Sequence, residues 1–154
     1  MPEPITVLAP LAGTVLAMSD VPDPVFAGAI LGPGLGIDPD RFTGTSVVSP
    51  VAGTIAKLHP HAFVVQLDAE RAVLVHLGLD TVQLGGEGFA LHAAEGDVVA
   101  AGDLVVSWDP AAVEAGGRSP VCPVVAIQAP AESVVCLLES GTTVKAGEPL
   151  LEWS

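Results

Sequence analysis

Short runs of β-branched residues that end at glycine or proline restrict the fold of this chain more than any other feature. The 154 residues include 17 glycines and 14 prolines, and these divide the sequence into short apolar runs. Because β-branched residues between turn residues favour strands, the runs predict strands rather than long helices. We therefore expect an all-β protein, a compact antiparallel β-sandwich or barrel with short helical turns. Typical runs are residues 5–8 (ITVL), 63–65 (FVV), 73–75 (VLV) and 134–137 (VVCL).

The only helix that the sequence predicts is short and starts near residue 110. Asp109 has the residue type of an N-cap, and Pro110 follows it at a position where proline suits the first helical turn. Gly116 and Gly117 would end the helix a few residues later.

Two segments of the sequence occur twice. Each copy is rich in turn residues next to β-branched ones, so we expect each to reverse the direction of a strand. The first pair is residues 9–15 (APLAGTV) and 49–55 (SPVAGTI), with a weaker third copy at 129–134 (APAESV); the second pair is residues 95–104 (EGDVVAAGDL) and 140–150 (SGTTVKAGEPL).

Charge and length limit the class of protein. The net charge of −13 argues against a nucleic-acid partner, which would be bound by clustered Lys and Arg. The acidic side chains keep an apolar chain in solution, and they could also steer a basic protein partner. A length of 154 residues suits one domain, so residues 1–154 are expected to form a single unit. With no signal peptide or membrane span in the sequence, we expect a cytoplasmic protein with free cysteines.

His76 lies within an unusually apolar stretch, residues 72–79 (AVLVHLGL). Side chains alternate between the two faces of a strand, so Val73, Val75 and Leu77 should share the face toward the core. His76 would then lie on the opposite face. A histidine at this position is either a structural group or a reactive one.

A second histidine is expected on the same face as His76. Residues 68–71 have the composition of a loop that joins strands at 61–67 and 72–79. A four-residue loop places Phe63 opposite His76, and a two-residue loop places His61 there. In both registers His61 and His76 share a face and lie within side-chain reach. A three-residue loop or a bulge would break this pairing.

Two neighbouring imidazoles with Asp80 close by are suited to two kinds of chemistry. Neutral imidazole is a common zinc ligand. It can also act as a nucleophile beside a second group that orients or stabilises it. The alternative is that one core histidine and one surface histidine meet by chance.

The stretch at residues 61–89 resembles the glucose-class EIIA domain of the bacterial phosphoenolpyruvate:sugar phosphotransferase system. The resemblance covers essentially the whole chain, and several motifs occur in the family's order and spacing, which makes it specific. The matching motifs are residues 21–27 (VPDPVFA), 32–37 (GPGLGI), 49–55 (SPVAGTI), 76–82 (HLGLDTV) and 86–89 (GEGF).

The resemblance implies a compact antiparallel β-sandwich, with residues 1–154 as one EIIA domain that acts as a phosphocarrier. The phosphocarrier protein HPr would donate a phosphoryl group to His76, with Nδ1–H of that ring held by a backbone carbonyl near Gly78. His61 would donate a hydrogen bond to the phosphoryl oxygens. His76 would pass the group to a cysteine on the EIIB domain of a sugar permease, so membrane contact would occur only through the permease. No cofactor is required for this reaction.

The resemblance also implies a surface that docks partners around the histidines. Asp23 and Asp80 match acidic positions that face an arginine on HPr, although Asp23 could be a turn former between prolines and Asp80 a strand cap. Five apolar residues match the ring that excludes water and docks partners, and core packing is the alternative for each. These five are Val25, Phe26, Ile30, Leu74 and Val82.

One position departs from the family pattern. The family often has a threonine two residues before the histidine that corresponds to His61, and this chain has His59 there. His59 could replace the threonine, act as an extra cation or face solvent, and we expect a solvent-facing loop residue. His92 matches no functional position and is expected at the surface.

Two other functions are consistent with parts of the sequence. The first is a zinc-dependent, metallopeptidase-like hydrolase with His59, His61 and His76 as ligands and an open position for water. Related peptidases also use an upstream histidine, and none precedes His59. Regulatory zinc held by His61 and His76 at another protein's carboxylate is a separate expectation. The second is a purely regulatory docking module that controls permeases or kinases through an apolar patch.

Overall fold

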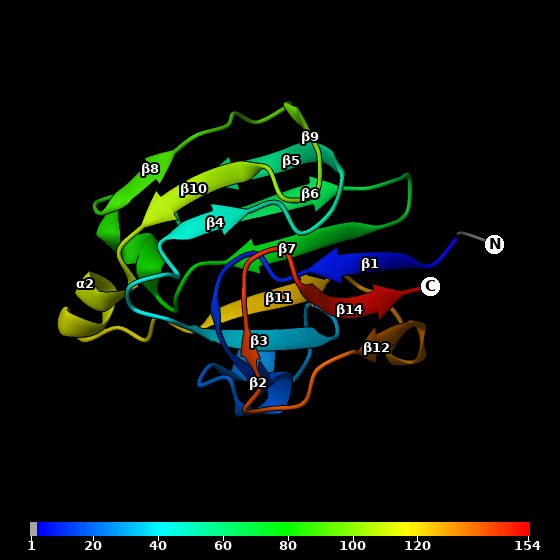
Figure 1. Cartoon of the computed structure of the whole chain (residues 1–154), viewed down its shortest axis with the longest axis horizontal. Coiled ribbons are helices and arrows are strands. Elements are labelled where there is room, and N and C mark those ends of the chain that lie inside the picture. Colours follow the sequence, from blue (N-terminus) through cyan, green and yellow to red (C-terminus); the bar gives the residue numbers. More distant parts are fainter. Residues whose placement is uncertain (1–2) are drawn as a thin grey trace.

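The computed structural model describes residues 3–154, which form fourteen strands, two short α-helices and three 3-10 helices (Figure 1). The antiparallel pairing of the strands confirms the predicted all-β class. No helix within residues 3–154 is long and apolar enough to cross a membrane. The elements in chain order are β1 (Ile5–Leu8), β2 (Gly13–Ala17), η1 (Met18–Asp20), α1 (Pro24–Ala27), β3 (Gly34–Pro39), β4 (Ser46–Val48), β5 (Gly53–His59), β6 (Ala62–Gln66), β7 (Ala72–His76), η2 (Thr81–Leu84), β8 (Phe89–Leu91), β9 (Val98–Val99), β10 (Leu104–Trp108), α2 (Pro110–Ala115), β11 (Cys122–Ala126), η3 (Ala131–Ser133), β12 (Val134–Cys136), β13 (Thr143–Val144) and β14 (Pro149–Trp153).

Three sheets surround the core of the described chain. The largest has eight strands in the order β13-β2-β3-β11-β7-β6-β5-β9, and the others are β1-β14-β12 and β4-β10-β8. Strands of all three sheets contribute fully buried side chains to one apolar cluster, among them Val7, Val75 and Val105. Figure 1 shows the start of β1 and the end of β14 at one end of the molecule and α2 at the other.

The repeated segments form corresponding turns in a duplicated arrangement of strands. The first pair joins β1 to β2 and β4 to β5. Leu8 N–H donates to the Pro50 carbonyl at 2.9 Å, and Val48 N–H donates to the Pro10 carbonyl at 2.8 Å. The two bonds are the same contact with the copies exchanged. The strands β1, β2, β12, β13 and β14 thus have the pairing pattern of β4, β5, β8, β9 and β10.

The second pair of repeats makes the turns that lead into and out of β9 and β13. Gly147 N–H donates to the Ala9 carbonyl at 2.9 Å, and Gly102 N–H donates to the Ser49 carbonyl at 2.8 Å. These turns therefore hold the first pair in place. The weaker third copy lies in η3 and at the start of β12, and it takes no part in this duplication.

Both α-helices begin at an aspartate. Asp109 caps α2 as predicted, accepting a hydrogen bond from Ala112 N–H at 3.1 Å, and Gly116 follows the last helical residue. The sequence did not predict α1. Asp23 caps it by accepting from Val25 N–H at 2.9 Å.

The hairpin of β6 and β7 forms where predicted, but its expected register is wrong. Ala62 lies opposite His76 and Gln66 opposite Ala72, so five residues, 67–71, connect the strands. The side chain of Asp68 organises this loop by accepting from the N–H groups of Glu70 at 3.0 Å and Arg71 at 2.8 Å. An odd loop length exchanges the faces that the two- and four-residue loops would have aligned.

His61 is outside the strand alternation altogether. It lies with Pro60 in the tight turn between β5 and β6, where side chains no longer follow the two faces of the sheet. The expected closeness of His61 and His76 is nevertheless present, because their ring centroids are 5.3 Å apart. The turn and not the strand register brings the two histidines together.

Candidate active site

His76, the last residue of β7, is held on the face opposite the core. Its neighbours Val75 and Leu77 are fully buried, while His76 itself is half-buried. Nδ1 of His76 lies 2.5 Å from the carbonyl oxygen of Gly78. Because a carbonyl only accepts hydrogen bonds, Nδ1 carries the proton in this contact, and the neutral ring then keeps a free lone pair on Nε2.

The turn after His76 requires glycine at position 78. Gly78 has φ +79°, and a Cβ there would lie 2.6 Å from Cγ2 of Thr81 and 3.1 Å from the Ser119 carbonyl oxygen. Thr81 Oγ1 donates to the Leu77 carbonyl at 2.7 Å. The backbone that supports His76 is therefore fixed by contacts on both sides. The sequence did not predict the supporting roles of Thr81 and Ser119. Only Thr81 could have been found from the sequence, because it lies in the HLGLDTV motif.

His61 approaches His76 from the β5–β6 turn. The two rings meet edge to face at an angle of 70°, and Leu77 N–H donates to the His61 carbonyl at 2.7 Å. His59, which is exposed, stacks on His61 with a centroid distance of 5.7 Å. His59 therefore lies at the edge of the site. Its side chain is exposed as expected, but the expectation of a loop residue is wrong, because His59 is the last residue of β5.

The environment favours neutral imidazole at both central positions. Burial lowers the pKa of His76, and this effect outweighs the Gly78 hydrogen bond and the charges of Asp23 and Asp80, which raise that pKa. Burial also lowers the pKa of His61, and protonated His76 and His59 would lower it further. Both rings are thus able to offer or accept a hydrogen bond without carrying charge near pH 7.

The two acidic residues expected near the histidines both act on the electrostatics of His76. Asp23 is half-buried and caps α1, so it also has the structural role that was weighed against a partner contact. Asp80 is exposed, has a left-handed backbone at φ 58°, and makes no side-chain cap of η2. Contact of either residue with a partner stays a prediction.

The five apolar residues expected around the site have different environments. Phe26 is buried, and its ring centroid lies 5.4 Å from that of His76. Leu74 is half-buried and packs on the same small cluster as Phe26. Core packing therefore accounts for Phe26 and in part for Leu74. It does not account for Val25, Ile30 and Val82, which are 41%, 64% and 62% exposed.

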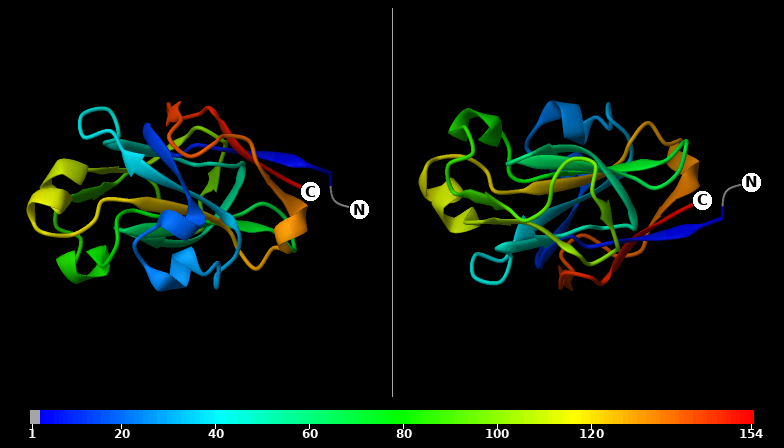
Figure 2. Two further views of the ribbon diagram at one scale, coloured as in Figure 1. Left: turned by 90° about the horizontal axis from the view of Figure 1, so that it is seen from below. Right: turned by 90° about the horizontal axis from the view of Figure 1, so that it is seen from above.

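The short helices that carry several of these residues lie on one side of the molecule. Figure 2 shows the blue coil of α1 and the green coil of η2 on the same side of the ribbon in both views. Leu79, next to Asp80, packs in the same cluster as Phe26. The predicted partner residues on the two segments thus flank the end of β7.

The arrangement of side chains does not support a metal site with three ligands from this chain. Within residues 3–154, no three or more His, Cys, Asp or Glu side chains are arranged to hold a metal ion. This includes His59, His61 and His76, the ligands of the alternative hydrolase. Zinc shared by His61 and His76 with another protein stays a prediction.

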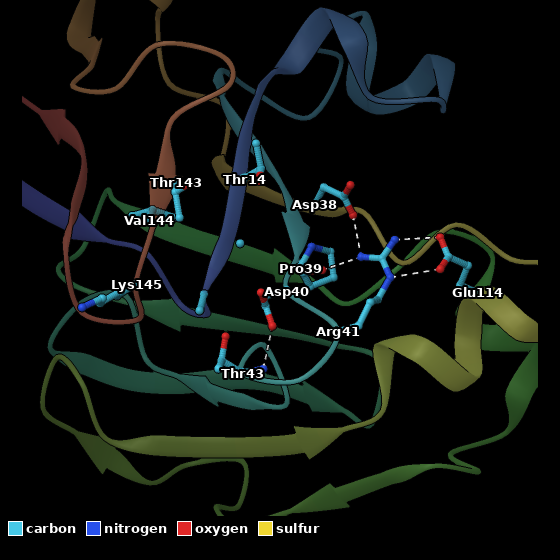
Figure 3. A pocket seen from close by; sticks show the side chains of 12 residues that line it. Thr14, Asp38, Pro39, Asp40, Arg41, Thr43, Glu114, Thr143, Val144 and Lys145 are labelled. Carbon is cyan, nitrogen blue, oxygen red and sulfur yellow. Dashed lines mark hydrogen bonds and ion pairs between the residues drawn. The ribbon is translucent and has the colours of Figure 1, made fainter.

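A large cavity lies elsewhere and does not include the histidines (Figure 3). It has a volume of about 570 Å³. The guanidinium of Arg41, which lines the cavity, is paired with Asp38 at 2.8 Å and with Glu114 at 2.7 Å. The candidate site is therefore a surface patch around two rings and not this cavity. The cavity is lined by Ala12, Gly13, Thr14, Asp38, Pro39, Asp40, Arg41, Thr43, Glu114, Thr143, Val144 and Lys145.

Comparison with known proteins gives the family. Residues 5–132 match the family described as phosphoenolpyruvate-dependent sugar phosphotransferase system, EIIA 1. A PTS system glucose-specific EIIA component from Halalkalibacterium halodurans is 40% identical over 152 residues, which cover 97% of this chain and 86% of the relative. A PTS system glucose-specific EIICBA component from Streptococcus pneumoniae is 47% identical over 108 residues, 69% of this chain and 14% of that protein. The solved glucose permease IIA from Mycoplasma capricolum superposes with a TM-score of 0.86 at 30% identity, covering 98% of this chain and 96% of that one. The chain therefore belongs to the EIIA 1 family of the phosphoenolpyruvate-dependent sugar phosphotransferase system.

Proposed function

We propose that this protein is a phosphocarrier that accepts a phosphoryl group from phospho-HPr on Nε2 of His76 and passes it to a cysteine of an EIIB domain. One observation carries the proposal: Nδ1 of His76 is engaged by the Gly78 carbonyl, so the lone pair of a neutral ring is on Nε2. The lowered pKa of His76 supports the same assignment, because the neutral ring is the nucleophile.

The transfer is a balanced displacement at phosphorus. The Nε2 lone pair forms a bond to phosphorus while the bond between phosphorus and HPr breaks, and that electron pair leaves with HPr. Nδ1 keeps its proton throughout and donates it in a hydrogen bond to the Gly78 carbonyl oxygen. The second transfer runs in the same way, with the cysteine sulfur of EIIB as nucleophile and His76 as leaving group.

The residues around His76 would stabilise the charge and limit water. A ring N–H of His61, whose centroid lies 5.3 Å from that of His76, would donate to a phosphoryl oxygen. Phe26 covers one side of the ring and leaves less room for water near the labile P–N bond. Asp23 and Asp80 would face a basic residue of HPr beside the reacting nitrogen.

An EIIB domain as the next acceptor is supported by the naming of one relative. The Streptococcus pneumoniae protein is called an EIICBA component, so it combines EIIA with EIIB and EIIC in one chain. The exposed side chains of Val25, Ile30 and Val82 supply apolar surface for such a partner. Contact with a membrane would then occur through the permease.

The test is intact-mass spectrometry at mildly alkaline pH after incubation with phosphoenolpyruvate, enzyme I and HPr. We expect one phosphate on the wild type and on His92→Ala, a control histidine outside the site, and none on His76→Ala. His61→Gln should accept phosphate but transfer it slowly to EIIB. Unphosphorylated wild type with active donors, or phosphorylated His76→Ala, would overturn the proposal.

A further inference from the structure

Three adjacent strands align two histidines on one face of the sheet. His59 of β5 lies directly opposite Ala62 of β6, and Ala62 lies directly opposite His76 of β7. Residues directly opposite one another in antiparallel strands point to the same face. His59, Ala62 and His76 therefore form one row across the sheet, with the smallest side chain in the middle.

The space above Ala62 has the width of one imidazole ring. Neighbouring strands are ~4.8 Å apart, so His59 and His76 stand roughly 10 Å from each other across Ala62. The ring of His61 comes from the adjoining turn and contacts the rings of both His59 and His76. Its centroid is 5.7 Å from that of His59 and 5.3 Å from that of His76. Ala62 is only 7% exposed beneath it.

The two walls of this slot contact His61 differently. His59 lies almost parallel to the His61 ring, at 25°, whereas His76 meets it edge to face at 70°. A turn residue lacks the neighbours that fix a side chain within a strand, so the parallel ring is the contact that limits rotation of His61 away from His76. Loss of that wall would leave the outer side of His61 open to solvent.

We propose that His59 is a positioning residue, whose ring forms the outer wall of a slot above Ala62 that holds the imidazole of His61 against His76. The proposal rests on the phosphocarrier function, since it assigns His59 to the step that His61 assists. This role requires a planar ring at position 59 but not a charge there. It also needs a side chain as small as alanine at position 62.

Substitutions can separate the ring from the charge. We expect His59→Ala to discharge its phosphate to a purified glucose-class EIIB domain about three- to tenfold more slowly than the wild type, the range expected for loss of one ring pair. His59→Phe keeps a planar ring without a titrating group and should restore most of the rate. Ala62→Val fills the slot from below and should slow the transfer as His59→Ala does. His92→Ala is the matched control and should transfer like the wild type.

Two outcomes of the transfer assay would overturn the proposal. One is a wild-type rate for His59→Ala, which would show that His61 needs no outer wall. The other is a rate for His59→Phe as low as that for His59→Ala, which would assign the effect to a property of histidine other than its ring.

A second measurement does not depend on phosphotransfer. The chain has 4 histidines, so their ring protons can be resolved by NMR in the unphosphorylated protein. We expect cross-relaxation between the His59 and His61 rings in the wild type and a shifted His61 resonance in His59→Ala. Absence of both effects would overturn the slot. Their presence in a protein that never accepts phosphate would leave the slot in place and refute the phosphocarrier function alone.

Discussion

Asp23 shows how one side chain serves both local structure and the candidate site. Its carboxylate caps α1 through Val25 N–H, and its charge raises the pKa of His76 against the effect of burial. The sequence placed Asp23 either in a turn or in a partner contact. The structure gives it a capping role that is compatible with both, since the second carboxylate oxygen is not used by the Val25 contact.

The pH dependence of phosphorylation should follow the lowered pKa of His76. Burial lowers the pKa of His76 below the value of ~6.5 for a free imidazole. The rate of phosphate acceptance should therefore be constant from about pH 8 to 7 and should fall only below pH ~6.5, where the ring becomes protonated. Asp23→Asn removes a charge that raises this pKa, so the fall should move to lower pH. NMR titration of the His76 ring alongside the phosphorylation rate checks both statements.

A variant that removes the cap controls this prediction. Asparagine is a good N-cap, whereas Asp23→Ala loses the cap as well as the charge and should be less stable by about 1 kcal/mol. Both variants should shift the His76 titration in the same direction. Identical titration of His76 in wild type and Asp23→Asn would contradict the electrostatic role.

Gly78 supports His76 through its backbone, so Gly78→Ala should affect stability and phosphorylation together. Alanine would be strained at φ +79° and would press on Thr81 and the Ser119 carbonyl. We expect a loss of about 2–4 kcal/mol in the free energy of unfolding, combining strain and overpacking. Urea unfolding and the phosphorylation assay measure the two effects.

Gly88 offers a matched control for the backbone strain alone. It has φ +86°, and a Cβ there would have no heavy atom within 4 Å. Gly88→Ala should therefore cost only the strain, about 1 kcal/mol, and leave phosphorylation unchanged. Equal losses for the two variants would show that the packing around Gly78 contributes nothing.

At the scale of elements, the sequence predicted what depends on local signals. The strands follow from β-branched runs, and α2 follows from Asp109, Pro110 and the closing glycines. The hairpin register did not follow, because the loop length depends on the Asp68 side chain and on where the Arg71 side chain goes. Neither the side-chain contact within the loop nor the long-range contact of Arg71 with Trp153 leaves a periodic pattern in the sequence. The sequence correctly predicted that His61 lies near His76, but from an incorrect strand register. The β5–β6 turn brings the two rings together.

Arg71 ties the β6–β7 loop to Glu3, which precedes β1, and to Trp153 in β14, and it should be a main contributor to stability. Its buried guanidinium contacts Asp68 at 2.8 Å, the Glu3 carbonyl at 2.9 Å and the Trp153 carbonyl at 3.1 Å. Arg71→Met keeps the length of the side chain but leaves two carbonyls without their donor. We expect a loss of about 2–4 kcal/mol in the free energy of unfolding, measured in urea.

Arg41 provides the comparison, because it also makes several hydrogen bonds with carboxylates but is more exposed. Its side chain is 26% exposed, against 10% for Arg71. Exposed ion pairs contribute little, so Arg41→Met should cost no more than about 1 kcal/mol. A larger loss for Arg41→Met than for Arg71→Met would contradict the assignment of stability to the buried guanidinium.

At the scale of the whole molecule, the duplicated strands are interleaved and not consecutive. β1 pairs with β14 from the other end of the chain, and β2 lies between β13 and β3 in the eight-stranded sheet. Trp153 in β14 and Trp108 in β10 hold equivalent places in the two copies. Neither copy encloses a core of its own, so the two should unfold together.

A chain that ends after Glu148 tests this cooperativity. It lacks β14, the only strand that pairs with both β1 and β12 within residues 3–154, and it loses the buried side chains of Leu150 and Leu151. Because the two copies share one core, we expect the intact β4-β10-β8 sheet to unfold as well. Trp108, which is buried and donates to the Gly44 carbonyl at 2.9 Å, is then the sole tryptophan and reports on that sheet. Its fluorescence should shift to that of a solvated indole and show no cooperative urea transition, while a chain lacking only Ser154 should behave like the full one. A cooperative transition of buried Trp108 in the shortened chain would mean that the second copy is stable alone, and that the duplication joins two separable folding units.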